Sequence, residues 1–274
     1  MEKRRMCPHC RAFITTSDRV CPYCNEPVGQ SVRRRERPFL GGFIPHARFL
    51  TVMILLINFG LYVATSIYSM RTGGGGGLDV DGRTLFLFGA KYRPAIFLGQ
   101  WWRLVTAGFL HGGLLHILMN SWVLFDLGAQ AEEAYGSARM VVFYFLATVA
   151  GFLASTWWSP AVSVGASAGI FGLIGAMIAF GMLHRSALGD ALRGMYLRWA
   201  IYGLLFGLLP GFQVDNAAHI GGLAAGFGAA YIAGIPRYAG SRSERLWRLA
   251  SYVCVAVTAF CFLQMYLWFS AVTR

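Results

Sequence analysis

The chain has 274 residues, of which 56% are hydrophobic and only 13% are charged, and its formal net charge is +12. A soluble domain normally carries about 25% charged residues, so this composition excludes an ordinary soluble protein and indicates a membrane protein. The basic surplus could indicate nucleic-acid binding, but most of it lies in a short N-terminal segment and in loops between apolar runs. That distribution is typical of membrane topology instead, and no nucleic-acid partner is expected.

The chain begins with a polar, cysteine-rich head over residues 1–30, followed by a basic linker over residues 31–48. The first uncharged run, Phe49–Met70, has about the 20 residues that a helix needs to cross the hydrocarbon. Residues 71–111 are expected to form a long first loop, because a glycine tract there precedes an interrupted aromatic segment of interfacial character. Six further apolar runs predict spans at roughly 112–131, 140–158, 166–184, 197–212, 216–235 and 249–272.

The charges of the loops predict how these spans are oriented. With the N-terminus in the cytoplasm, 18 lysines and arginines lie on the inner side of the membrane and 6 on the outer side. Inner loops of membrane proteins carry such an excess, so we expect a multi-pass protein whose head is cytoplasmic. The second, fourth and sixth spans then all run from the outer face inward. The basic linker also favours contact with the head groups of membrane lipids.

Four cysteines of the head form the pattern C-x2-C-x10-C-x2-C, with Cys7 and Cys10 in one pair and Cys21 and Cys24 in the other. Four thiolates in two such pairs are typical of a structural zinc site, and the ten-residue gap leaves room for a hairpin between the pairs. Two disulfides are the alternative, but a cytoplasmic head stays reduced, which favours zinc. About 30 residues cannot form a core alone, so the metal would supply folding free energy. The head could dock a cytoplasmic partner, regulate the protein or only stabilise it.

Polar side chains are costly inside a membrane, and few occur in these spans. His116 and Asn120 lie in the second span, Ser167 in the fourth and His219 in the sixth. The predicted spans place Ser167, His116 and His219 one to two turns inside the outer ends of their helices, and Asn120 one turn below His116. The four residues therefore share one layer near the outer face. A hydrolytic site within a membrane needs such a layer, because the reaction consumes water.

Small residues surround two members of this layer. Ser167 lies within Gly-Ala-Ser-Ala-Gly, and His219 is followed by glycines at positions three and seven further on, Gly222 and Gly226. The fourth span offers a matching surface of small residues, so the two helices should pack closely and bring Ser167 and His219 within hydrogen-bonding distance. Each feature alone is more often plain helix packing or a structural histidine. A transport pathway would need polar residues further inward, but residues 169–180 and 220–232 are apolar.

Three blocks of sequence resemble the rhomboid intramembrane proteases, over roughly residues 49–235. The blocks are Trp102-Arg103 through His111 to His116-Ile-Leu-Met-Asn120, the segment GASAGIFG at 165–172, and the segment AHIGGLAAG at 218–226. Glu132 also lies where rhomboids have a glutamate after the second span. The resemblance implies an all-α membrane protein with a rhomboid-like six-helix core over 49–235. Residues 236–274 would add a cytoplasmic loop and a seventh transmembrane helix, and the head would be a small zinc-ribbon-like domain.

The same resemblance implies the roles of the polar layer. Ser167 corresponds to the nucleophile and His219 to its general base, while His116, Asn120 and the Ser167 backbone N–H correspond to the oxyanion hole. Arg103 corresponds to a structural residue of the first loop. No cofactor is needed for catalysis. Two positions depart from the common pattern: Ala168 follows the serine where many rhomboids have glycine, and Phe171 replaces a tyrosine that often stacks on the histidine.

The expected function is therefore that of a serine endopeptidase that cleaves transmembrane-protein substrates near the outer face of the membrane. By resemblance, this membrane would be the cytoplasmic membrane of a bacterium. The alternative is a catalytically silent rhomboid-like protein that binds membrane helices. Such a protein would be expected to lack the serine or the histidine, and this chain has both Ser167 and His219.

Overall fold

The computed structural model describes residues 4–7, 10–25, 28, 49–74, 78–209, 214–236 and 242–273. The chain divides into two compact units, Met1–His46 and Ala47–Arg274. Most of the predicted linker, residues 31–48, belongs to the first unit, and the whole linker lies outside the described residues.

The first unit contains two short antiparallel strands, β1 (Arg4–Met6) and β2 (Phe13–Thr15), with Met6 paired to Phe13. The strands enclose the first cysteine pair, and only β2 lies in the ten-residue gap between the two pairs. The chain turns at the first pair: the Cys7 N–H donates to the Ala12 carbonyl, and Arg11 adopts a left-handed φ of 62°. Four buried side chains form the small core of this unit, Cys7, Ile14, Cys21 and Val28.

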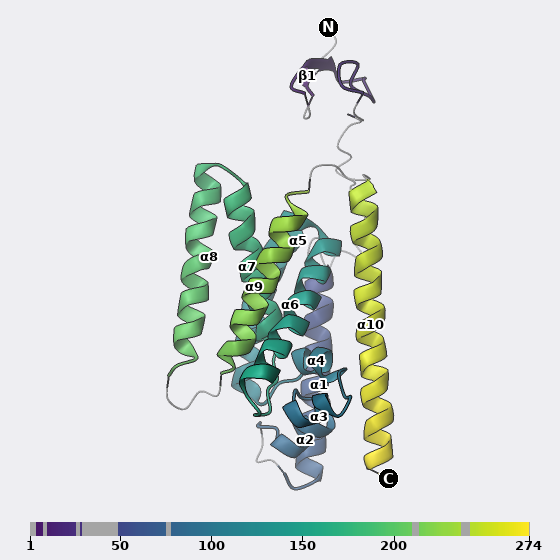
Figure 1. Cartoon of the computed structure of the whole chain (residues 1–274), viewed down its shortest axis with the longest axis vertical. Helices are drawn as coiled ribbons and strands as arrows, with labels where there is room; N and C mark the ends of the chain where they lie inside the picture. The colour runs from purple at the N-terminus through teal and green to yellow at the C-terminus, as the bar shows by residue number, and fades with distance from the viewer. Residues whose placement is uncertain are drawn as a thin grey trace. The chain divides into compact units, whose positions relative to one another are not determined.

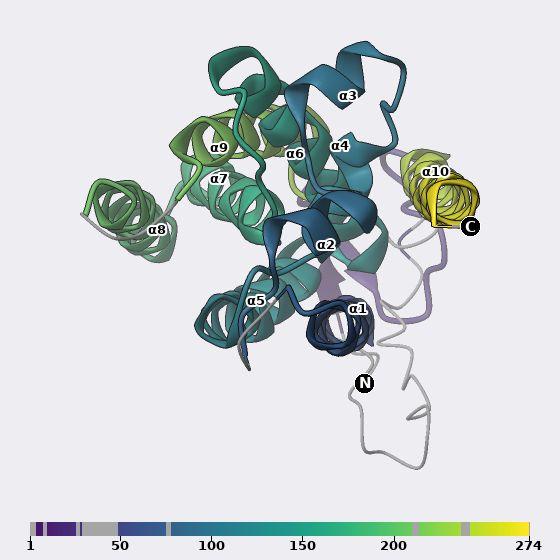
Figure 2. The same cartoon turned by 90° about the horizontal axis from the view of Figure 1, so that it is seen from below.

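The second unit is a bundle of long helices (Figure 1). Its seven long helices are α1 (Phe49–Arg71), α5 (Leu114–Tyr135), α6 (Ser137–Trp158), α7 (Ser167–Leu183), α8 (Ala187–Phe206), α9 (Asn216–Ala233) and α10 (Arg242–Val272). The first loop folds into short helices, namely α2 (Gly82–Leu87), α3 (Arg93–Phe97), α4 (Arg103–Thr106) and the 3-10 turn η3 (Ala107–Phe109). Seen from below, α8 and α10 lie on opposite sides of the bundle (Figure 2).

Helix α7 is the centre of the bundle, since 13 of its 17 residues are buried. A helix that is apolar on all sides is expected to lie among other helices, and α7 contacts α5, α6, α8 and α9. Its contact with α9 is made by backbone atoms. A Cβ placed on Gly222 would come within 2.2 Å of the Ala168 carbonyl oxygen, and one on Gly226 within 2.0 Å of the Gly172 carbonyl oxygen. The close packing predicted from the small residues is confirmed.

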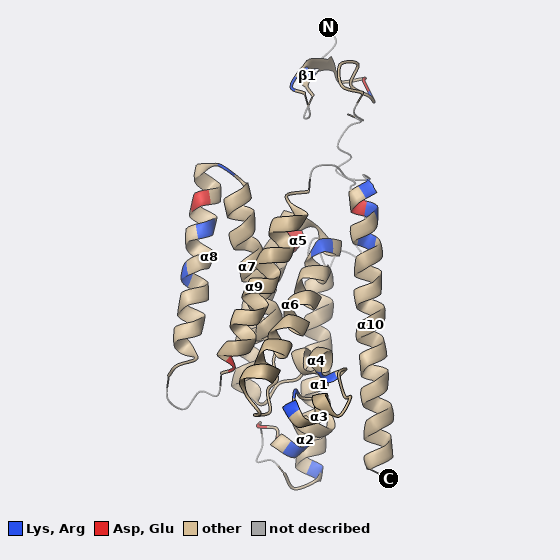
Figure 3. Cartoon of the chain, in the orientation of Figure 1, with Lys and Arg blue, Asp and Glu red and all other residues tan. Residues whose placement is uncertain are grey.

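Among the described residues, three helices are long and apolar enough to cross a membrane by length and composition, α1, α6 and α10. Helix α7 is equally apolar but has 17 residues, while α5 and α8 carry charged side chains (Figure 3). The fifth predicted span, 197–212, is wrong in its limits, because α8 begins ten residues earlier and ends at Phe206. Ser186 caps the helix there, its hydroxyl accepting the Gly189 N–H at 3.1 Å. The apolar run marks only the hydrophobic part of α8, whereas the cap and the backbone hydrogen bonds determine where the helix begins.

Glu132 connects α5 to the start of α1. Its carboxylate is 4% exposed and accepts hydrogen bonds from the Thr51 hydroxyl at 3.0 Å and from the N–H groups of Leu50 and Thr51. These N–H groups belong to the first turn of α1, where a helix has no internal acceptors and favours a negative charge. The glutamate therefore fixes α1 against the bundle.

Candidate active site

Ser167 is the first residue of α7, not one to two turns inside the helix as the apolar run predicts. No helical turn precedes Ser167, because Gly165 has a φ of +132°, a conformation that L residues rarely adopt and that interrupts a helical path. The Gly165 N–H donates to the Ala107 carbonyl at 3.0 Å, which ties this segment to the first loop. Ser167 thus lies at the positive end of α7, where backbone N–H groups have no acceptor within the helix.

His116 and Asn120 reach this segment from α5. A Cβ placed on Gly165 would lie 2.7 Å from His116 Nε2 and 3.6 Å from Asn120 Nδ2, so both side chains approach the backbone just before Ser167. His116 Nδ1 accepts a long hydrogen bond of 3.5 Å from the Gly112 N–H. In a neutral imidazole the other nitrogen, Nε2, then carries the proton. Two N–H donors therefore converge beside Gly165.

His219 lies in the first turn of α9. Its ring stacks on Phe171, with centroids 4.0 Å apart and planes 12° from parallel, as the resemblance implies for the aromatic residue one turn after the serine. The histidine is 6% exposed, and its Nδ1 atom has no hydrogen-bond partner among the described residues. The four predicted residues therefore lie within the first two turns of α5, α7 and α9, on helices joined by close packing.

Two charged residues that the sequence analysis did not single out support these helix starts. Asp215 caps α9, accepting the Ala218 N–H at 3.0 Å, and its other oxygen accepts the Ser155 hydroxyl of α6. An aspartate just before an apolar helix is a recognisable cap signal, so this residue could have been predicted. Lys91 is fully buried and donates from Nζ to the carbonyls of Ser159 and Ala161, at 2.7 and 3.0 Å. Burial lowers the pKa of its ammonium, which the Asp215 charge partly opposes.

Comparison with known proteins assigns the chain to a protein family. The Rhomboid domain family matches residues 98–236, half of the chain, including all four residues of the polar layer. The chain belongs to the rhomboid family. It is an integral membrane protein whose rhomboid core is extended by the seventh helix α10 and by a small zinc-ribbon-like head.

Three curated relatives illustrate the range of this family. Rhomboid protease GluP of Bacillus subtilis (strain 168) is 36% identical over 185 residues, which cover 66% of this chain and 36% of the relative. Rhomboid-like protease 3 of Toxoplasma gondii is 40% identical over 151 residues, covering 53% and 56%. RHOMBOID-like protein 6, mitochondrial, of Arabidopsis thaliana is 35% identical over 161 residues, covering 57% and 51%. The matched part therefore spans 36% to 56% of the length of these rhomboid relatives.

The head of this rhomboid protein gathers its four cysteines into one cluster. Their sulfur atoms all lie within 4.8 Å of one another, with Cys7 Sγ 3.7 Å from Cys24 Sγ and Cys10 Sγ 3.6 Å from Cys21 Sγ. Four thiolates around zinc, at a Zn–S distance of about 2.3 Å, would be about 3.8 Å apart in a tetrahedron. A disulfide would need about 2.05 Å. The cluster therefore fits a tetrahedral metal ion with a closed ligand set.

Proposed function

We propose that this rhomboid protein is an intramembrane serine endopeptidase that cleaves transmembrane substrates with Ser167 as nucleophile and His219 as base. The observation that carries the proposal is the meeting of three helix starts. Ser167 begins α7, two N–H donors of α5 approach Gly165 two residues before it, and His219 of α9 stacks on Phe171. Membership of the rhomboid family supports the same activity, since one relative is named a rhomboid protease.

In the proposed reaction, His219 takes the proton of the Ser167 hydroxyl as its oxygen attacks the substrate carbonyl. The carbonyl oxygen becomes an oxyanion, which the His116 Nε2–H, the Asn120 amide and the Ser167 backbone N–H stabilise. Such preorganised donors usually contribute most to catalysis. The histidine then gives its proton to the leaving amine, and a water molecule hydrolyses the acyl-enzyme by the same steps. Neither half of the reaction needs a cofactor.

The loop charges support a cytoplasmic N-terminus, with 18 basic residues on the inner side against 6 on the outer side. The polar layer then lies near the outer face of what we propose is a bacterial cytoplasmic membrane. A helical substrate engages its backbone carbonyls in hydrogen bonds, so cleavage requires local unwinding. Substrates with glycine, proline or other small residues near the outer end of their span are therefore expected to be preferred.

The decisive test is labelling with a serine-reactive fluorophosphonate. Wild-type protein should be labelled, whereas Ser167→Ala and His219→Ala should lose the label, because one lacks the nucleophile and the other its base. Ser163→Ala is the matched control, since Ser163 lies four residues away and its recorded contacts with Lys91 are made by the backbone. Labelling that persists in Ser167→Ala would contradict the nucleophile. A wild-type protein that is never labelled would favour the silent, helix-binding alternative.

For the head, we propose a structural zinc ion held by Cys7, Cys10, Cys21 and Cys24. Binding would supply the folding free energy that so small a core cannot. Metal analysis of the purified protein should find one zinc per chain, and Cys21→Ser should lose it. The rate at which fluorophosphonate labels Ser167 should stay within twofold of wild type, since the site needs no metal. A zinc-free protein with two disulfides would contradict the assignment. Any cytoplasmic partner of the head would then be sought with the metal-loaded protein.

A further inference from the structure

The appended helix α10 meets the first loop at a buried arginine. Arg103 is fully buried, and its guanidinium carbon lies 4.3, 4.6 and 4.8 Å from the ring centroids of Phe86, Trp102 and Trp268. Its Nε donates to the Gln100 side chain at 2.7 Å, and its Nη1 donates to two carbonyls of the first loop. We call these three rings, Phe86, Trp102 and Trp268, the aromatic cage of Arg103. Phe86 and Trp102 belong to the first loop, whereas Trp268 belongs to α10.

The aromatic cage stabilises the buried charge of Arg103, a role that a carboxylate often has in other proteins. Among the described residues no acidic side chain forms an ion pair with Arg103, and its Nη2 has no hydrogen-bond partner. A cation removed from water in this way is stabilised by the faces of aromatic rings, most effectively by tryptophan. Trp268 also meets Phe86 and Trp102 edge-on or tilted, with centroids 5.4 and 6.0 Å apart. Removing it would leave one side of the guanidinium without a partner.

A short path of contacts leads from this cage to the nucleophile. The Ala107 N–H donates to the Arg103 carbonyl, and the Ala107 carbonyl accepts the Gly165 N–H. Gly165 precedes Ser167 by two residues, and a Cβ placed on it would lie 2.7 Å from His116 Nε2. Lys91 makes a second connection between the same loop and the segment before Ser167, because its backbone and its ammonium bond residues 159–163. The position of the first loop therefore sets the backbone on which the nucleophile and its neighbours depend.

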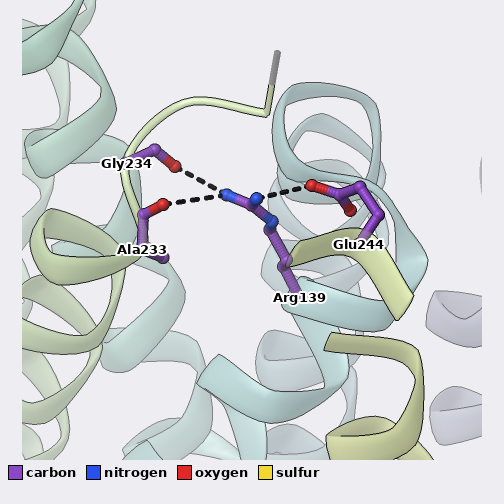
Figure 4. A network of polar contacts seen from close by, with 4 residues as sticks. All are labelled: Arg139, Ala233, Gly234 and Glu244. Carbon is purple, nitrogen blue, oxygen red and sulfur yellow. Dashed lines mark hydrogen bonds and ion pairs between the residues drawn. The ribbon is translucent and has the colours of Figure 1, made fainter. Parts of the chain in front are cut away.

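We propose that Trp268 is a positioning residue for the active site, acting through its cation–π contact with Arg103 on the segment that carries Ser167. The proposal rests on the protease function proposed above. It makes the seventh helix a part of the active-site support. The other end of α10 is attached separately, by the ion pair between Glu244 and Arg139 (Figure 4). Changing Trp268 therefore loosens the helix at one end only.

The test compares Trp268→Ala, Trp268→Leu and Trp268→Phe in the full-length protein in nanodiscs. Leucine keeps apolar volume without a ring face, whereas phenylalanine keeps the face. The control is Tyr266→Ala, which removes a ring from the same turn that is 62% exposed. The readouts are the rate constant and the final extent of fluorophosphonate labelling, together with kcat and KM for a transmembrane substrate. We expect Trp268→Ala and Trp268→Leu to lower the labelling rate constant and kcat about tenfold. KM and the final extent of labelling should not change. Trp268→Phe should recover most of the lost rate.

Four other results would contradict the role proposed for Trp268. Labelling of Trp268→Ala at the wild-type rate, while Ser167→Ala is unlabelled, would overturn this inference alone. Equal rates for the Leu and Phe variants would also overturn it, since apolar packing would then suffice. A lower final extent with an unchanged rate constant would assign Trp268 to folding instead of positioning. A wild-type protein that is not labelled would overturn the protease function and this inference with it.

Discussion

Helices α9 and α10 both pack against α6, but they are held to the bundle by opposite means. Helix α9 contacts α7 through glycine, with backbone atoms so close that a single added carbon would overlap them. Helix α10 has only 11% of its most apolar stretch buried, and the contacts that hold it to the bundle are made by side chains. Some of these lie along the helix, such as the buried Cys261, and others gather around Arg139 and Arg103 near its two ends. The first contact carries the proposed base, and the second supports the loop behind the nucleophile.

The difference predicts how each contact responds to change. Backbone atoms in direct contact cannot move apart without moving both helices, so the spacing of α7 and α9 has almost no tolerance. Aromatic and arginine side chains can change rotamer, and a lost contact can be partly replaced. Substitutions in the glycine contact should therefore remove the fold or the activity, whereas those at the ends of α10 should change rates and local stability by smaller amounts.

The largest effect is expected for Gly226→Ala. Its new methyl group would lie 2.0 Å from the Gly172 carbonyl oxygen and 2.5 Å from the Gly172 Cα, both backbone atoms that cannot turn away. Overpacking of this kind costs about 1–3 kcal/mol in a core that can adjust, and here more, because α9 must separate from α7. We expect fluorophosphonate labelling to be lost and unfolding in detergent to occur at a much lower temperature.

Gly228→Ala is the matched control, because a Cβ at Gly228 on the same helix has no atom within 4 Å. Alanine also favours helix by about 1 kcal/mol over glycine, so the control should be as stable as wild type or slightly more so. If both variants behaved alike, the close contact between α7 and α9 would not determine the geometry of the site.

A smaller effect, confined to catalysis, is expected for Asn120→Ala. Its amide approaches Gly165, two residues before the proposed nucleophile, and removing one oxyanion donor typically lowers turnover about 10²–10³-fold. Turnover of a transmembrane substrate should fall at least tenfold, while the unfolding temperature stays near that of wild type. Met119→Ala, one residue away and 41% exposed, should leave turnover unchanged. Wild-type turnover in Asn120→Ala would remove this residue from the site.

The features that the residues themselves predicted correctly depend on the spacing of residues that are close together in the sequence. Small residues four apart predict a close helix contact wherever two such surfaces meet, and the contacts of Gly222 and Gly226 confirm it. Paired cysteines likewise predict a cluster of four thiolates, because each pair is short enough to point both sulfurs one way. The stacking of Phe171 on His219 was expected from the resemblance to the rhomboid proteases and not from spacing.

The features that escaped prediction depend on contacts between distant segments or on backbone conformation. Apolarity cannot show that the positive φ of Gly165 makes Ser167 the first residue of α7, nor that a capped polar stretch extends α8 back to Ala187. A lysine in a loop is normally solvated, so nothing local marks Lys91 as buried. Trp268 lies 165 positions after Arg103, and no spacing rule connects them. Lys91, Gly165 and Trp268 all join the first loop to other parts of the protein.

The smallest effect is expected at the far end of α10. Arg139 is 3% exposed and donates to Glu244 at 2.5 Å and to the carbonyls of Ala233 and Gly234 that end α9 (Figure 4). Glu244→Gln removes one charge but leaves an acceptor, and both carbonyls still hold the arginine, so the loss should be about 1 kcal/mol. Hydrogen exchange in the first turns of α10 should rise, while labelling of Ser167 stays within twofold.

Asp190→Asn tests whether any lost ion pair would do the same. Asp190 and Arg193 form a pair at 3.3 Å on the surface of α8, with side chains 70% and 45% exposed, and such pairs contribute about 0–1 kcal/mol. Exchange in α10 should not change in this variant. A tenfold loss of labelling in Glu244→Gln would contradict this expectation. It would show that the contact of α10 with Arg139 affects the reactivity of Ser167 as strongly as its contact with Arg103. A loss confined to exchange at the start of α10 leaves Trp268 as the contact through which this helix acts.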